Sequence, residues 1–182
     1  MDQISHHIMD LAENSTAAGA GLVEIRIVED LPADRLTVEI ADDGRSAARP
    51  QPARGNDAFQ TDQESGLGLT LFARACEESA GRVEIEGAAE QGSRLRGWMQ
   101  YSHPNRKPLG DLGETLITLL MGSPGVSWVL CHEKIRSDGR RDELRLDTRA
   151  IQAEVGNMPL AHPEVIRRIR VCLRQQQTKL KD

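Results

Sequence analysis

The sequence predicts an α+β fold, a two-layer sandwich in which helices cover one face of a mixed or antiparallel β-sheet. Two observations carry this prediction. Some segments place apolar residues at helical spacing, whereas others alternate apolar and charged residues as half-buried strands do. These segments follow one another as helix, strand, strand, long loop, helix, strand and strand. With 182 residues, of which 38% are hydrophobic, the chain is long enough to bury a core.

A first helix is predicted in the segment His7–Ala20. Ile8 and Leu11 fall on one side of it at helical spacing. Asp10 and Asn14 lie one turn apart along the adjoining edge of this apolar face, where two polar groups can share one ligand. Taken alone, the segment equally fits an amphipathic surface helix whose two polar groups are solvated.

Two strands joined by a turn follow the helix. Residues 22–29 alternate apolar and charged side chains, and a turn signal around Pro32 leads into a second strand over residues 35–41. The Asp-Asp-Gly run at residues 42–44 ends this strand. Residues 45–65 lack periodicity and form a loop of about twenty residues, a length typical of functional or disordered loops.

Regular structure returns after this loop. The Gly-Leu-Gly-Leu run at residues 66–69 opens a helix that ends near Ser79, and two strands are expected over residues 82–86 and 93–101. This part, residues 1–102, is predicted to be one domain.

A shift of composition after Ser102 marks a boundary. The run His-Pro-Asn-Arg-Lys-Pro at residues 103–108 has the composition of a linker. Residues 103–182 are predicted to form a small α+β domain that interacts with a partner. Its expected elements are a helix over 109–121, strands over 126–135 and 142–146, and helices over 148–155 and 163–179.

Composition argues against several classes of protein. No apolar run approaches the length that spans a membrane, and the N-terminus shows no signal-peptide pattern, so a cytoplasmic protein is expected. The three cysteines, Cys76, Cys131 and Cys172, include no Cys-x-x-Cys pair. This pattern argues against a disulfide framework, structural zinc or an iron–sulfur cluster.

Charge is divided unevenly along the chain. Residues 1–102 carry a net charge of −9 and residues 103–182 a net charge of +4. An acidic N-terminal part is a poor match for nucleic acid, and a polyphosphate bound there needs a metal ion or backbone amides to offset repulsion. The last helix carries a basic surface, which is either solvated or docks onto an acidic partner. Its residues are Arg167, Arg168, Arg170 and Arg174.

Four short segments occur in a fixed order. They are residues 13–17 at the end of the first helix, residues 42–44, residues 66–69, and the pair Gly92-Ser93. Each alone is commonly a turn or a tight loop. In this order, with the long loop between the second and third, they resemble the GHKL ATPases, the superfamily of histidine kinases, type II topoisomerase and mismatch-repair ATPases, and heat-shock chaperones. The resemblance covers residues 3–100 and implies a Bergerat-type ATP-binding fold.

The resemblance implies a role for each segment. Asn14 would offer its side-chain oxygen to a magnesium ion on the triphosphate, and Asp42 would accept a hydrogen bond from the adenine amino group. Gly44 would let the chain leave the strand beside the base without a Cβ in the way. Ser93 would support Asp42, or the base through water.

The same resemblance implies where the phosphates lie. The glycines of the third segment would let backbone amides close on the phosphates at a helix N-terminus, and the loop at residues 45–65 would close over ATP as a lid. The residues of this segment are Gly66, Leu67, Gly68 and Leu69.

Some positions depart from the family pattern. Ser46 stands where the family has a second glycine, and the lid keeps only Ala58-Phe59 of a Phe-rich segment. Members that hydrolyse ATP briskly have a glutamate as general base one turn before the asparagine. Asp10 stands there and is one methylene shorter, so slow hydrolysis is expected. Glu13 points about a third of a turn away and is assigned a supporting role.

These features predict a regulatory protein that binds Mg-ATP and slowly hydrolyses it or transfers its phosphoryl group to a separate protein. Since the given sequence starts at the ATP-site helix, no phosphoacceptor helix pair is expected in cis, and His6 and His7 are interpreted as packing or capping residues. A kinase resembling the anti-sigma serine kinases therefore fits better than a histidine kinase with its acceptor in cis. Two alternatives remain open: a non-catalytic switch in which ATP orders the lid, and an interaction scaffold with a degenerate nucleotide site.

A weaker resemblance concerns the partner. Residues 106–112 and 146–149 resemble the tail of small bacterial ATP-binding proteins often encoded beside iron-only hydrogenase or related redox subunits. This resemblance implies a redox or hydrogenase-related partner. A homodimer is also compatible with the sequence.

Overall fold

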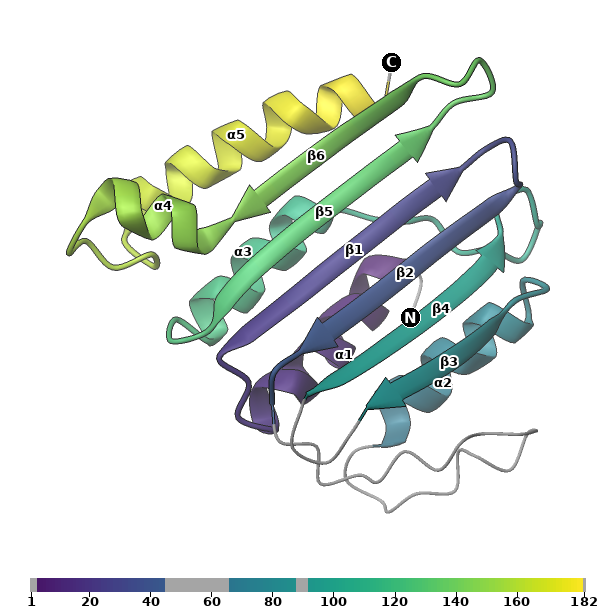
Figure 1. Cartoon of the computed structure of the whole chain (residues 1–182), viewed down its shortest axis with the longest axis horizontal. Helices are drawn as coiled ribbons and strands as arrows, with labels where there is room; N and C mark the ends of the chain where they lie inside the picture. Colours follow the sequence, from purple (N-terminus) through teal and green to yellow (C-terminus); the bar gives the residue numbers. More distant parts are fainter. Residues whose placement is uncertain (1–2, 45–65, 88–91, 182) are drawn as a thin grey trace.

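The computed structural model describes residues 3–44, 66–87 and 92–181 (Figure 1). The predicted lid at residues 45–65, with Ser46 and Ala58-Phe59, lies outside the described residues. The described helices and strands agree with the predicted ones to within a few residues at each end. Their order is α1 (Ile4–Ala17), β1 (Leu22–Asp30), β2 (Arg35–Asp42), α2 (Gly66–Glu77), β3 (Arg82–Gly87), β4 (Ser93–Gln100), α3 (Leu112–Gly122), β5 (Ser127–Ile135), β6 (Arg141–Asp147), α4 (Thr148–Val155) and α5 (Pro163–Lys181).

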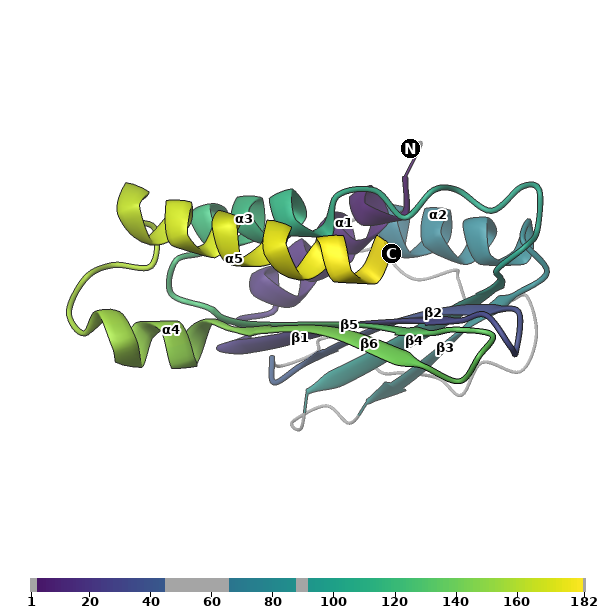
Figure 2. The same cartoon turned by 90° about the horizontal axis from the view of Figure 1, so that it is seen from above.

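The described strands form a six-stranded sheet in the order β3-β4-β2-β1-β5-β6. β1 and β5 run parallel and the other neighbouring pairs run antiparallel, so the sheet is mixed. Helices α1, α2, α3 and α5 lie over one face of the sheet (Figure 2). The predicted α+β sandwich is therefore confirmed.

Strand β1 illustrates how the sequence builds the two layers. Val23, Ile25 and Ile27 are buried in the core, whereas Glu24 and Arg26 between them are exposed. Successive side chains of a strand point to opposite faces, so this alternation gives the sheet one apolar face and one charged face. Burial of the apolar face under the helices supplies the main favourable contribution to folding.

The two predicted parts of the chain share one sheet and one core. β1 pairs along its whole length with β5, and the core cluster includes Ile8 and Phe72 as well as Trp128 and Leu173. A parallel pair needs a long crossover connection, and α3 lies within the one that joins the two halves of the sheet. A difference in role between residues 1–102 and 103–182 stays a prediction. In the described part of the chain, no helix has both the length and the apolar character needed to cross a membrane.

Candidate functional site

Asp42, the last residue of β2, lies at the centre of a hydrogen-bond cluster at one end of the sheet. Within the described residues, Ser15 Oγ and Ser93 Oγ donate to its Oδ2, at 2.9 Å and 2.7 Å, and the Gly44 N–H donates to its Oδ1 at 2.9 Å. Hydrogen bonds to a carboxylate are stronger than those between neutral groups, so these donors fix its orientation. A carboxylate has about four acceptor sites, which leaves capacity for a donor on a ligand.

Different elements of the fold bring the two hydroxyls to Asp42. The antiparallel register of β2 and β4 sets Ser93 opposite Asp42, so the contact that the sequence allowed between them is present. Ser15 comes from α1, where it is 7% exposed on the face that packs on the sheet. It follows Asn14 directly in the chain. The sequence alone does not distinguish Ser15 from a solvated hydroxyl on a helix face, and its role follows from the burial that the fold gives it.

Two glycines let the backbone pass close to Asp42. A Cβ on Gly44 would lie 3.1 Å from Asp42 Oδ1 and 3.2 Å from the Ala18 carbonyl oxygen. Gly92 has a φ of +84°, and a Cβ there would lie 1.9 Å from the Asp42 carbonyl oxygen. Glycine is required at position 92 for two reasons. Residues with a side chain disfavour this φ, and the atom that a Cβ would meet belongs to the backbone and cannot easily move away.

Asp43 has a structural role that its position in a turn motif does not reveal. Its Oδ1 accepts hydrogen bonds from the backbone N–H groups of Gly21 and Leu22, at 2.7 Å and 2.8 Å. Short acidic side chains at strand ends commonly bond to nearby backbone in this way. Asp43 thereby fastens the loop after α1 to the end of β2 and holds the helix that carries Ser15 beside the strand that carries Asp42.

A second cluster forms where α2 begins beside the middle of α1. A Cβ on Gly68, in the first turn of α2, would lie 3.2 Å from Asp10 Cβ and 3.8 Å from Asn14 Nδ2. Asn14 is exposed and Asp10 is half-buried. The first N–H groups of a helix have no partner within it and favour anions. The fold therefore brings an amide, a carboxylate and a helix N-terminus together.

In the other residues of the Gly-Leu-Gly-Leu segment, only the backbone offers polar groups to a ligand. Gly66 opens α2, Leu67 is 74% exposed, and Leu69 packs against the core. The chemistry of these groups fits Mg-ATP. Magnesium is commonly bound through one or two protein oxygens together with substrate phosphates and water, so a single side-chain oxygen from Asn14 is compatible with it. Among the described residues, no group of three or more His, Cys, Asp or Glu is arranged to hold a metal ion.

His7, one turn before Asp10, has a packing environment. It is 3% exposed, and its ring centroid lies 6.0 Å from that of Phe72. Burial lowers the pKa of His7 below its ordinary value, and the nearby Asp10 opposes this shift only in part. A buried imidazole packed on Phe72 fits the packing role predicted from the sequence.

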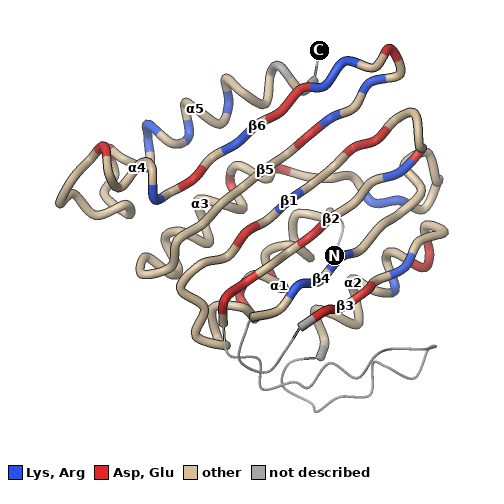
Figure 3. Tube along the Cα trace, in the orientation of Figure 1, with Lys and Arg blue, Asp and Glu red and all other residues tan. Residues whose placement is uncertain are grey.

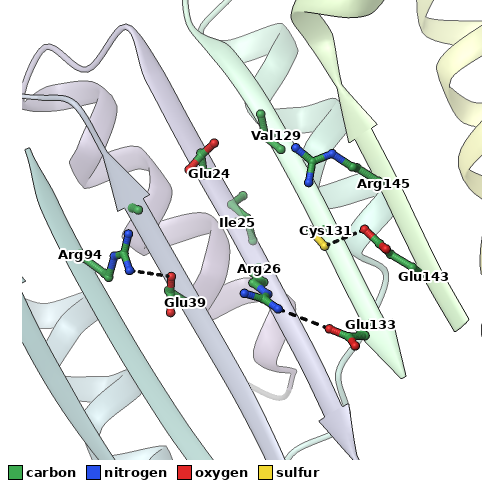
Figure 4. A pocket seen from close by; sticks show the side chains of 11 residues that line it. Glu24, Ile25, Arg26, Glu39, Arg94, Val129, Cys131, Glu133, Glu143 and Arg145 are labelled. Carbon is green, nitrogen blue, oxygen red and sulfur yellow. Dashed lines mark hydrogen bonds and ion pairs between the residues drawn. The ribbon is translucent and has the colours of Figure 1, made fainter. Parts of the chain in front are cut away.

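The charged face of the sheet carries a hollow of about 440 Å³ (Figure 4). Charges of both signs alternate along the strands (Figure 3). Arg26 contacts Glu133 at 3.4 Å and Arg94 contacts Glu39 at 3.6 Å, while burial and a hydrogen bond to Glu143 raise the pKa of the Cys131 thiol. Exposed pairs of this kind contribute little energy. No predicted site residue lines this hollow in the described part of the chain.

A protein-family model matches the N-terminal part of the chain. The family model described as "Histidine kinase-, DNA gyrase B-, and HSP90-like ATPase" matches residues 1–103. No curated protein sequence matches the chain.

Two solved structures resemble the fold. The first, titled "Crystal Structure of N terminal domain of a DNA repair protein", is 11% identical with a TM-score of 0.50 and covers 81% of this chain. This chain spans 53% of that one, about half its length. The second, titled "Aquifex aeolicus MutL ATPase domain complexed with ADP", is 18% identical with a TM-score of 0.48, and the match covers 85% of this chain and 68% of that one. The first likeness shows a shared fold.

Proposed function

Because the chain belongs to the family of histidine kinase-, DNA gyrase B- and HSP90-like ATPases, which implies ATP binding, we propose that it holds Mg-ATP where α1 and α2 meet the ends of β2 and β4. One observation carries this proposal. The hydrogen bond from Ser15 to Asp42 joins the helix that bears Asn14 to the strand that bears Asp42. This bond supports the proposal, because it joins the two elements that bear the groups proposed for the opposite ends of the nucleotide.

At the base end, Asp42 accepts the hydrogen bond of the adenine amino group. Its carboxylate is already oriented by Ser15, Ser93 and Gly44, so little ordering is needed when the nucleotide binds. A nucleotide with an acceptor in place of the amino group would set oxygen against oxygen. Asp42 therefore selects adenine over guanine.

At the phosphate end, the Asn14 oxygen would hold the magnesium ion, and the N-terminus of α2 receives the phosphate oxygens. Bound magnesium would supply positive charge that offsets the repulsion between the triphosphate and an acidic part of the chain. The absence of a side chain at Gly68 leaves room beside Asp10 and Asn14 for the approach of a phosphate.

Asp10 is the general base in this proposal. It lies on α1 one turn before Asn14 and beside the first turn of α2, where it can orient a water or an acceptor hydroxyl and take its proton. Its shorter side chain reaches less far than a glutamate, so turnover is slow. The same shortening favours the second candidate function, a switch in which ATP changes what the chain binds and is not hydrolysed.

The proposed role is regulatory, and it needs a separate protein as phosphoacceptor or as the target of the switch. The basic face of α5 is the proposed docking surface for an acidic partner, with Arg167 and Arg174 both exposed on it. A hydrogenase-related or other redox partner rests on the sequence resemblance alone.

We expect Mg-ATP to raise the melting temperature of the chain by roughly 5 to 10 °C at a ligand concentration about a hundredfold above its dissociation constant. Asn14→Ala should remove the magnesium-dependent part of this rise, because it deletes the metal ligand. Glu24→Ala, which truncates an exposed carboxylate on the opposite, charged face of the sheet, should keep it. The measurement is thermal unfolding with ATP in the presence and absence of magnesium.

Phosphate release then separates the two candidate functions. A slow release of phosphate that Asp10→Asn abolishes supports hydrolysis, and transfer of a labelled γ-phosphoryl group to an added protein supports the kinase. Stabilisation by Mg-ATP with neither release nor transfer supports the switch. A melting temperature that Mg-ATP leaves unchanged would refute both and leave the scaffold.

A further inference from the structure

Within the site, Ser15 differs from the other groups that contact Asp42. Ser93 and Gly44 belong to the sheet or to the chain directly after Asp42, so backbone pairing and connectivity already hold them. Ser15 belongs to the helical layer and is 27 residues away in sequence. Among the described residues that donate to this carboxylate, Ser15 is the one that links the helical layer to the sheet.

We infer that Ser15 is a positioning residue that sets the specificity of the proposed site for adenine. The inference rests on the proposed function and adds a residue to it. Ser15 and Ser93 both donate to Oδ2, which leaves Oδ1 with a single backbone donor, Gly44, in the part of the chain that the structure describes. Oδ1 thus retains acceptor capacity, and the pair of hydroxyls prevents the carboxylate from rotating it away from a ligand donor.

Because Ser15 lies on α1, the orientation of the Asp42 carboxylate depends on the helix that carries the proposed metal ligand. Ser15 directly follows Asn14 and is 7% exposed, so water has little access to replace its hydroxyl. Hydrogen bonds from buried donors to charged acceptors are among the stronger ones. Loss of the Ser15 hydroxyl therefore frees the Asp42 side chain to turn away from a ligand donor.

The test compares two nucleotides. ATP carries the amino group that Asp42 accepts, and purine riboside triphosphate carries hydrogen at the same carbon and is otherwise identical. A positioning role changes the ratio of the two affinities, whereas a general structural defect weakens both nucleotides alike. Both affinities are measured with magnesium by isothermal titration calorimetry.

The wild-type chain is expected to prefer ATP, and Ser15→Ala is expected to reduce this preference roughly tenfold while binding the analogue as before. Ser15→Thr keeps the hydroxyl and should restore the preference. Ser79→Ala is the matched control, because Ser79 is buried and its hydroxyl has no hydrogen-bond partner among the described residues. Should Ser15→Ala fail to fold, Ser15→Cys, with a weaker donor of similar size, gives the same comparison.

An unchanged ratio in Ser15→Ala, or an equal loss for both nucleotides, would overturn the inference and leave the proposed function standing. A wild-type chain that binds both nucleotides equally would contradict the role of Asp42 and of Ser15 together. A wild-type chain that binds neither would refute the proposed function itself.

Discussion

Replacement of Asp42 by alanine is expected to weaken Mg-ATP binding about a hundredfold or more. The change removes the acceptor for the adenine amino group, and burial of an amino group without a partner carries a large penalty in a site built to bind it. Asp42 is half-buried, so water can take the place of its carboxylate beside Ser93 and Gly44, and the fold should persist. Binding is measured by titration after the folded state has been verified by thermal unfolding.

Two further variants sharpen this test. Asp42→Asn should bind with intermediate affinity, because the serine hydroxyls can turn to accept from the new amide and leave its oxygen for the base. Glu39→Ala removes an acidic group from the same strand but from the opposite, charged face of the sheet, where Glu39 pairs with Arg96 at 2.6 Å. It should bind as the wild type does. Wild-type affinity in Asp42→Ala would remove Asp42 from the site.

Replacement of Gly92 by alanine is expected to destabilise the chain by about 3 kcal/mol or more. A positive φ costs an L residue about 1 to 2 kcal/mol, and displacement of the Asp42 carbonyl, whose oxygen lies 1.9 Å from where the alanine Cβ would stand, adds an overpacking cost of about 1 to 3 kcal/mol. Because the clash falls on the backbone of Asp42, nucleotide binding should weaken as well. Urea unfolding measures the first effect.

Gly139 provides a matched control for the backbone angle. It has the same φ of +84°, and a Cβ there would meet no atom of the described residues within 4 Å. Gly139→Ala should therefore cost about 1 to 2 kcal/mol and leave nucleotide binding unchanged. Equal free energies of unfolding for the two variants would show that the contact between a Cβ at position 92 and the Asp42 carbonyl oxygen adds no destabilisation beyond that of the backbone angle.

Local elements were predictable because local spacing encodes them. The alternation in β1 identifies a strand, and the helical spacing of Ile8 and Leu11 identifies a helix. Neither identification needs the elements that these segments pack against. The pairing of β1 with β5 was not predictable, since alternation shows which face of a strand is apolar but not which strand lies next to it in the sheet. As a result, the sequence suggested a separate C-terminal unit, whereas the fold extends one sheet through both parts.

The site shows the same limit at finer scale. Asp42 and Ser93 could be placed together because the resemblance to the GHKL ATPases assigns both to the base end of one site. Ser15 could not, because a small hydroxyl on a helix face is equally compatible with solvation, and its burial depends on how α1 crosses the sheet. Asp43 and Asp42 are adjacent carboxylates in one turn, and the sequence does not show that their roles differ. The hydrogen bonds of Asp43 with Gly21 and Leu22 depend on the path of the loop after α1, which only the structure gives.

The location of the nucleotide is the central claim, and backbone amide NMR signals followed during titration with Mg-ATP test it most directly. The account predicts shifts at Ser15, Gly44, Gly68 and Ser93, with those of Arg26 and Cys131 on the charged face unchanged. Shifts confined to the residues of the charged face would contradict it, since they would place ATP on the opposite side of the sheet from Asp42.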